Sequence, residues 1–133
     1  MSTKTIFQKI IDGELPSYKI WEDDKHLAFL DIMPIHLGQI LIIPKKPVDY
    51  VFDMEDAEYI ELMKVSKKLA KVMMKALKPV KVGMIIEGLE VPHVHVKLIP
   101  IDYQKSLGTH AQIVAADDLA TTQQQLLSVM NNF

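Results

Sequence analysis

One stretch, Val91 to Pro100, constrains the chain most, because it alternates β-branched and polar side chains. Its polar members are His93, His95 and Lys97, and its apolar members occupy positions 94, 96 and 98. Successive side chains of a strand point to opposite faces of a sheet. We therefore predict a strand over 92–99 with one face in the core and one face that presents two imidazoles and an ammonium group to a cleft.

Three interpretations of the two histidines are open. An imidazole can attack phosphorus and form a phosphoryl- or nucleotidyl-histidine, with Lys97 neutralising the developing charge. The pair could instead share one zinc ion, but zinc needs further ligands. The remaining histidines, His26, His36 and His110, stand in predicted turns, where surface positions are typical. The third interpretation is a solvated strand face without chemistry.

Composition excludes several functions. The 133 residues suit one domain. They include no cysteine, which excludes disulfides, thiol nucleophiles and cysteine-based zinc sites. A net charge of −2 gives no general attraction to nucleic acid or to an acidic membrane. Neither a signal peptide nor a run of membrane-spanning length is evident. We expect a cytoplasmic protein without nucleic-acid or membrane partners.

Apolar periodicity and turn residues predict the elements. We expect a short helix over 5–11, with strands over 18–21, 27–31 and 39–43. A long amphipathic helix should run from Asp53, a good N-cap, to Lys78 before Pro79. Strands over 81–87 and 92–99, a polar loop over 102–110 and a helix over 118–130 complete the chain. This is an α+β fold, with an antiparallel sheet of about five strands and its helices packed mainly on one side.

The long helix carries a wide apolar stripe and an opposite face rich in lysine. We expect the lysine face to be solvated and the stripe to cover the sheet. The stripe is also wide enough to contact a second subunit.

Several short motifs occur in one order along the chain: Gly13-Glu14-Leu15-Pro16-Ser17, Glu22-Asp23-Asp24, Leu27 to Ile32, Leu41 to Lys46, and His93-Val94-His95. With these motifs the chain resembles the histidine-triad (HIT) family of nucleotide hydrolases and transferases up to about Pro100. It is similar to the small nucleoside-phosphoramidase branch. The resemblance implies a single HIT-like domain over 1–133.

The resemblance also implies roles for individual residues. His95 matches the middle histidine, which is the nucleophile on the α-phosphate, and His93 matches its supporting neighbour. Asp31 closes the second strand and corresponds to the acidic residue that binds the ribose hydroxyls. The walls of the base pocket would be Ile6, Phe7, Ile10, Phe29 and Ile32, although plain core packing is the alternative for each of them.

Three positions depart from the family pattern. Lys97 replaces the third histidine, so a point charge stands where a hydrogen-bonding phosphate ligand or proton relay is expected. The phosphate loop is shortened to 87–90, where Gly88 would approach the nucleotide and Glu90 would lie near an anionic phosphate. The zinc ligands of some members are replaced by Thr5, Gln8 and Pro47. We therefore expect no zinc and no cofactor.

Together these features predict a homodimeric enzyme that acts on a purine nucleoside phosphoramidate, a nucleotidyl ester or a dinucleotide. The reaction would pass through a nucleotidyl-His95 intermediate. The alternative is a non-catalytic module that keeps the HIT fold and binds a nucleotide or another protein, since the third histidine is missing.

Overall fold

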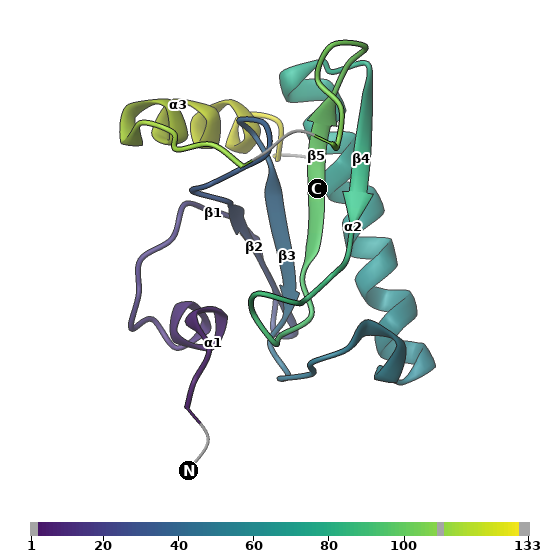
Figure 1. Cartoon of the computed structure of the whole chain (residues 1–133). Helices are drawn as coiled ribbons and strands as arrows, with labels where there is room; N and C mark the ends of the chain where they lie inside the picture. Colours follow the sequence, from purple (N-terminus) through teal and green to yellow (C-terminus); the bar gives the residue numbers. More distant parts are fainter. Residues whose placement is uncertain (1–2, 109–110, 131–133) are drawn as a thin grey trace.

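The computed structural model describes residues 3–108 and 111–130. In order along the chain, its elements are α1 (Ile6–Ile11), β1 (Lys19–Glu22), β2 (His26–Leu30), β3 (Ile40–Pro44), the 3-10 turn η1 (Val51–Asp53), α2 (Asp56–Leu77), β4 (Lys81–Ile85), β5 (Val96–Ile101) and α3 (Ala116–Leu127). Figure 1 shows α1 and α2 on opposite sides of the sheet.

The five strands form one antiparallel sheet in the order β1-β2-β3-β5-β4. Every residue of the central strands β2 and β3 is buried. Their continuous apolar sequence follows from this position, because both faces of these strands are covered. The predicted α+β class, with an antiparallel five-stranded sheet, is confirmed.

The larger core lies between the sheet and α2. Leu62, Leu69 and Met73 of α2 pack in one cluster with Ile42 and Val96 of the sheet. Helix α3 joins the same cluster through Leu119 and Leu126. Two of the three helices in the described residues therefore cover one face, as predicted. The lysines of α2 are exposed, which confirms the solvated face.

The smaller core lies on the other face, under α1. Thr5 caps this helix, with its Oγ1 accepting the backbone N–H of Gln8 at 3.1 Å. Gly13, at φ +80°, redirects the chain after the helix, in a conformation that favours glycine. Phe7 of α1 packs with four strand residues, Leu27, Phe29, Leu41 and Ile43.

The predicted start of the long helix is wrong by two residues, because its N-cap is Glu55 and not Asp53. Asp53 ends the 3-10 turn η1, and α2 begins after Glu55. The turn buries Val51, and the backbone at Met54 is extended, so the chain changes direction before the helix starts. The predicted end is correct, because Lys78 closes α2 in the left-handed conformation directly before Pro79.

The predicted strand over 92–99 is wrong at both ends. Strand β5 begins at Val96, so neither His93 nor His95 lies on a strand, and it continues to Ile101. Pro92 lacks a backbone donor, and the backbone N–H of Val94 donates to Val48 rather than to β4. Residues 86–95 therefore form a longer connection than the 88–91 segment that the predicted strands leave between them. Strands β4 and β5 still pair.

The terminal helix is shifted from the predicted 118–130, since α3 runs from Ala116 to Leu127. No helix in the described part of the chain combines the length and apolarity needed to cross a membrane.

Candidate active site

The alternating stretch keeps its two-sided character although it is only partly a strand. Val94, Val96 and Leu98 are buried in the α2-side core. Lys97 is the register partner of Leu41, which faces α1. Cross-strand partners share one face of a sheet, so Lys97 lies on the α1 face.

The two histidines lie on the same α1 face, around the ring of Phe7. The ring centroids of Phe7 and His95 are 4.8 Å apart, at an interplanar angle of 73°. Those of Phe7 and His93 are 6.2 Å apart, at 89°. Both are edge-to-face contacts, which hold the imidazoles in fixed orientations. His93 and His95 are 1% and 5% exposed, so the two imidazoles that were expected to face a cleft are almost completely buried.

Hydrogen bonds to carbonyl groups fix the proton positions on both rings. The Nδ1–H of His95 donates to the carbonyl of His93 at 2.7 Å. The Nε2–H of His93 donates to the carbonyl of Pro44 at 2.8 Å. A carbonyl only accepts, so a neutral His95 carries its proton on Nδ1 and keeps a lone pair on Nε2. The lone pair on Nε2 is the one a nucleophile needs.

Burial is the main reason that the pKa of His95 is lowered from its ordinary value. The hydrogen bond to the carbonyl of His93 opposes this shift, while the charge of Lys97 adds to it. The carboxylate of Asp31 raises the pKa, which places that group within electrostatic range of the imidazole. Burial also lowers the pKa of His93. Both rings are therefore neutral near pH 7.

Asp31 follows β2 on the α1 face and is rigidly held. Its Oδ1 accepts the backbone N–H of Met33 at 2.9 Å, and its Oδ2 accepts the side-chain amide of Gln39, also at 2.9 Å. The oxygen of the same amide accepts the backbone N–H of Ile35 at 2.8 Å. Gln39 is only 1% exposed. Sequence spacing does not indicate this positioning residue, because its partners Ile35 and Asp31 lie four and eight residues away in a turn.

The residues expected to line a base pocket divide into two groups. Phe7 and Phe29 are core residues, with their rings 5.8 Å apart, and Ile10 packs against the same cluster. Ile6 and Ile32 are 51% and 58% exposed. The structure thus places three of the five side chains in the α1-side core and exposes the other two to solvent.

Gly88 lies in the loop between β4 and β5, at φ +72°. A Cβ atom there would approach the carbonyl oxygen of Asp49 at 3.4 Å. Glycine is thus favoured by the positive φ, whereas the contact with Asp49 is an ordinary van der Waals distance. Glu90, in the same loop, is exposed.

Two of the three remaining histidines are not surface residues, which corrects the expectation from their predicted turns. His26 is 3% exposed because it opens β2 and packs beside the ring of Trp21. His36 is 7% exposed, and its Nε2 donates to the carbonyl of Ser106 at 2.8 Å. His110 lies outside the described residues.

The site belongs to a class of α+β proteins in which a loop carrying His-x-His enters a strand of a five-stranded antiparallel sheet. Comparison with known proteins identifies the family, because the model of the HIT domain matches residues 12–104. The chain therefore belongs to the HIT family.

Individual relatives agree with this assignment. An uncharacterized HIT-like protein from Borreliella burgdorferi is 40% identical over 102 residues, which cover 71% of this chain and 73% of the relative. The adenosine 5'-monophosphoramidase HNT1 of Saccharomyces cerevisiae is 38% identical over 127 residues, 92% of this chain and 80% of that protein. The crystal structure of a HIT-like protein involved in cell-cycle regulation from Bartonella henselae superposes with a TM-score of 0.85, at 26% identity, over 97% and 98% of the two chains.

Proposed function

We propose that this protein is a nucleotide hydrolase or transferase that acts on the α-phosphate of a purine nucleoside phosphoramidate, a nucleotidyl ester or a dinucleotide. The observation that carries the proposal is the state of His95. Its Nδ1–H is bound to a backbone carbonyl and burial keeps the ring neutral, which leaves the Nε2 lone pair as the nucleophile. The similarity to an adenosine 5'-monophosphoramidase supports this substrate class.

The reaction has two balanced steps. Nε2 of His95 forms a bond to the α-phosphorus, and the bond from phosphorus to the leaving nitrogen or oxygen breaks with its electron pair. The leaving group takes a proton from solvent. Water then attacks the nucleotidyl-histidine, which releases the nucleoside monophosphate and regenerates the neutral imidazole. The carbonyl of His93 supports the ring throughout, because it stabilises the Nδ1–H of the histidine that becomes positively charged.

The remaining site residues take supporting roles in this proposal. Asp31 accepts hydrogen bonds from the ribose hydroxyls, since its carboxylate is already oriented by hydrogen bonds from Met33 and Gln39. Ile6 and Ile32 contact the purine, and the buried side chains of Phe7, Phe29 and Ile10 support the base pocket. Binding of the purine removes the exposed apolar surface of Ile6 and Ile32 from water. Gly88 allows the loop backbone to approach the phosphate.

Lys97 takes the position of the third histidine in this proposal. It lies on the α1 face, two residues after the nucleophile, and its charge lowers the pKa of His95. An ammonium group there stabilises the negative charge that develops on the phosphate oxygens.

Residues 1–133 would form a single HIT-like domain, and a cytoplasmic location stays a prediction.

Turnover of adenosine 5'-phosphoramidate tests the proposal directly. We expect the purified chain to release AMP, and to bind AMP in a calorimetric titration. Binding without hydrolysis of phosphoramidate, nucleotidyl ester or dinucleotide would favour the non-catalytic module instead. Failure to bind any purine nucleotide would contradict both.

The pH dependence of His95 follows from its burial. Because the pKa of His95 in the folded state is lowered, the neutral imidazole persists below pH 6.5, its ordinary pKa. The buried neutral imidazole therefore contributes stability above pH 6.5, and this contribution is lost as the pH falls through the folded-state pKa. We expect an NMR titration of the His95 ring to give a pKa below 6.5, with the acid limb of kcat/KM at the same pH. An imidazole that titrates at or above 6.5 would contradict the buried neutral nucleophile.

We also propose a homodimer. Strand β4 is an outer strand of the sheet, so half of its backbone groups face away from β5. Met84 on β4 and Met74 on α2 are 49% and 39% exposed. A second copy related by a two-fold axis would pair with this edge and cover the apolar side chains.

Light scattering tests the dimer. We expect the mass of two chains at micromolar concentration and a shift towards monomer in Met84→Lys, because a two-fold contact places the new charge there twice. Ile113→Lys is the control, since Ile113 is 88% exposed, belongs to neither β4 nor α2, and follows Gln112, whose backbone N–H donates to Pro34 in the β2–β3 connection. A monomeric mass for the native chain would contradict the proposal.

A further inference from the structure

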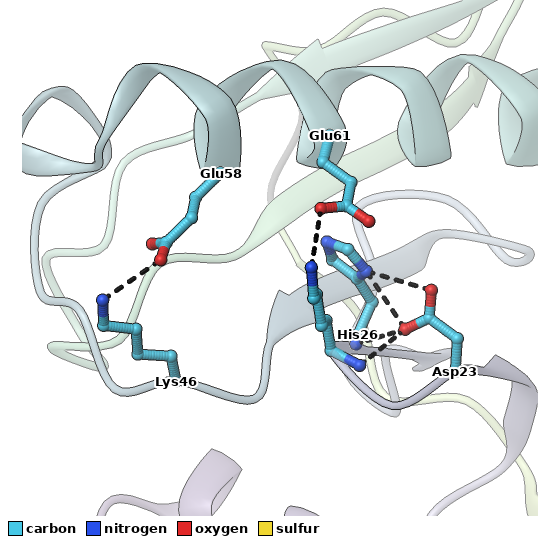
Figure 2. Close-up of polar contacts among 6 residues, drawn as sticks. Asp23, His26, Lys46, Glu58 and Glu61 are labelled. Atoms are coloured by element: carbon cyan, nitrogen blue, oxygen red, sulfur yellow. Dashed lines mark hydrogen bonds and ion pairs between the residues drawn. The ribbon is translucent and has the colours of Figure 1, made fainter.

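A second cluster of ionisable side chains lies on the opposite face of the sheet from His95. Asp23 comes from the β1–β2 turn, His26 opens β2, and Glu61 comes from α2 (Figure 2). One possible ligand atom from each residue lies within 4.8 Å of the other two. The side chain of His26 is 4% exposed, whereas those of Asp23 and Glu61 are 32% and 43% exposed.

We propose that Asp23, His26 and Glu61 form a binding site for a divalent transition-metal ion, with zinc as the best match. One imidazole and two carboxylates are ligands that zinc accepts, and three protein ligands leave a fourth position open. The proposal is independent of the function assigned to His95.

The spacing within the cluster suits such an ion. The Nδ1 of His26 is 3.1 Å from Oδ1 of Asp23 and 3.3 Å from Oδ2. Zinc bonds of 2.0–2.2 Å place neighbouring ligands of a tetrahedron about 3.3 Å apart. The ion would replace the proton that now joins the imidazole to the carboxylate, because both atoms can remain near their present positions.

Glu61 must move by the largest amount, and its surroundings permit this movement. Among the residues that the structure describes, its carboxylate pairs with the ammonium of Lys25 alone, at a long 3.6 Å, and the Lys25 side chain is 64% exposed. An exposed ion pair of this kind contributes little. The neighbouring cations are engaged elsewhere, since Lys46 binds Glu58 at 3.1 Å and Lys45 binds Glu22 at 2.7 Å.

A cavity of about 290 Å³ lies beside the cluster and gives access to it. His26 and Glu61 both line this cavity, together with Pro44, Met54 and Glu58. Water entering the cavity can therefore occupy the open position of the ion. The cavity also gives the ion a path to the buried imidazole.

This inference departs from the expectation that the chain binds no zinc. The absence of zinc was expected because Thr5, Gln8 and Pro47 replace the zinc ligands of some relatives, and because His93 and His95 alone are too few ligands. His26 was assigned to the surface, and Glu61 lies 35 residues further along the chain. Only the packing of α2 against β2 brings the two together.

Calorimetric titration of the chelator-treated full chain with Zn²⁺ tests the site. We expect one equivalent to bind to the native chain. Glu61→Gln and Asp23→Asn should each weaken this binding about tenfold or more, because each removes a charged ligand. Glu58→Gln is the matched control, since it lies one turn away on α2, lines the same cavity and belongs outside the cluster. It should leave affinity within about twofold.

Two results would overturn the proposal. The first is the absence of stoichiometric zinc binding by the native chain. The second is zinc binding with an affinity that Glu61→Gln and Asp23→Asn leave unchanged. If His95→Ala abolished that binding at the same time, the zinc site would be assigned to the His-x-His loop instead. Circular dichroism of each variant confirms that the fold is retained, which the exposed position of Glu61 leads us to expect.

Discussion

His95→Ala should abolish turnover of adenosine 5'-phosphoramidate, with a loss in kcat of about 10⁴-fold or more, as expected when a covalent nucleophile is removed. The physical reason is that the alanine variant lacks the Nε2 lone pair, while the other site residues remain. Binding of AMP should stay within a few-fold, because Asp31 and the apolar walls are unchanged. Steady-state kinetics and calorimetry on the same preparation measure both quantities.

The control is a thermal unfolding curve of each protein, since His95 is buried and contacts Phe7. His95→Asn offers a second variant that keeps a polar group at the position. Full hydrolysis by either variant would show that another group is the nucleophile.

Lys97→Ala should lower kcat/KM by about a hundredfold or more, the loss found when one preorganised stabiliser of developing charge is removed. Lys97→His should keep nucleotide affinity within a few-fold and raise turnover of slow phosphoramidates, because it restores the family pattern. Kinetics on a panel of substrates with different leaving groups measures both effects. Lys64→Ala, at an exposed lysine on the solvated face of α2, is the matched control and should leave kcat/KM unchanged.

Other outcomes assign a different role to this lysine. A small effect of Lys97→Ala would mean that the ammonium reaches solvent and contributes little to the chemistry. If the native chain and Lys97→His both bind nucleotide and are inert on every substrate, the non-catalytic module is the better account.

Much of the fold could be predicted from the sequence because its elements carry strong local signals. The apolar run of β3 and the stripe of α2 specify a buried strand and an amphipathic helix without reference to the rest of the chain. The antiparallel pairings of β1 with β2 and of β4 with β5 also agree with the economy of short connections, whereas the position of β5 beside β3 does not follow from it.

The misplaced elements depend on distant partners. His93 leaves the strand because its ring bonds to Pro44, 49 residues earlier, and Val94 bonds to Val48. Alternation along 92–99 could not indicate these bonds, although it correctly placed Val94, Val96 and Leu98 in the core. Asp53 is a residue type that favours N-caps, but it ends a 3-10 turn whose Val51 is buried.

For the candidate site, the sequence indicated which chemical groups are present. The structure adds the burial, the protonated ring nitrogen and the hydrogen bonds of these groups. Spacing suggested that His95 and Lys97 share a face, and the register of Lys97 with Leu41 supports this. The tautomer of His95 and the support of Asp31 by Gln39 depend on hydrogen bonds that spacing does not specify. The cluster of Asp23, His26 and Glu61 depends on contact between α2 and β2.

The proposed function requires that His95 attacks the α-phosphate and carries the nucleotide covalently. Rapid mixing with adenosine 5'-phosphoramidate, an alkaline quench that preserves phosphohistidine, and mass spectrometry of the digested chain test it most directly. We predict an adenylyl group on His95 that forms before AMP is released and is absent from His95→Ala. Hydrolysis without a transient adduct, or an adduct on any other residue, would contradict the account.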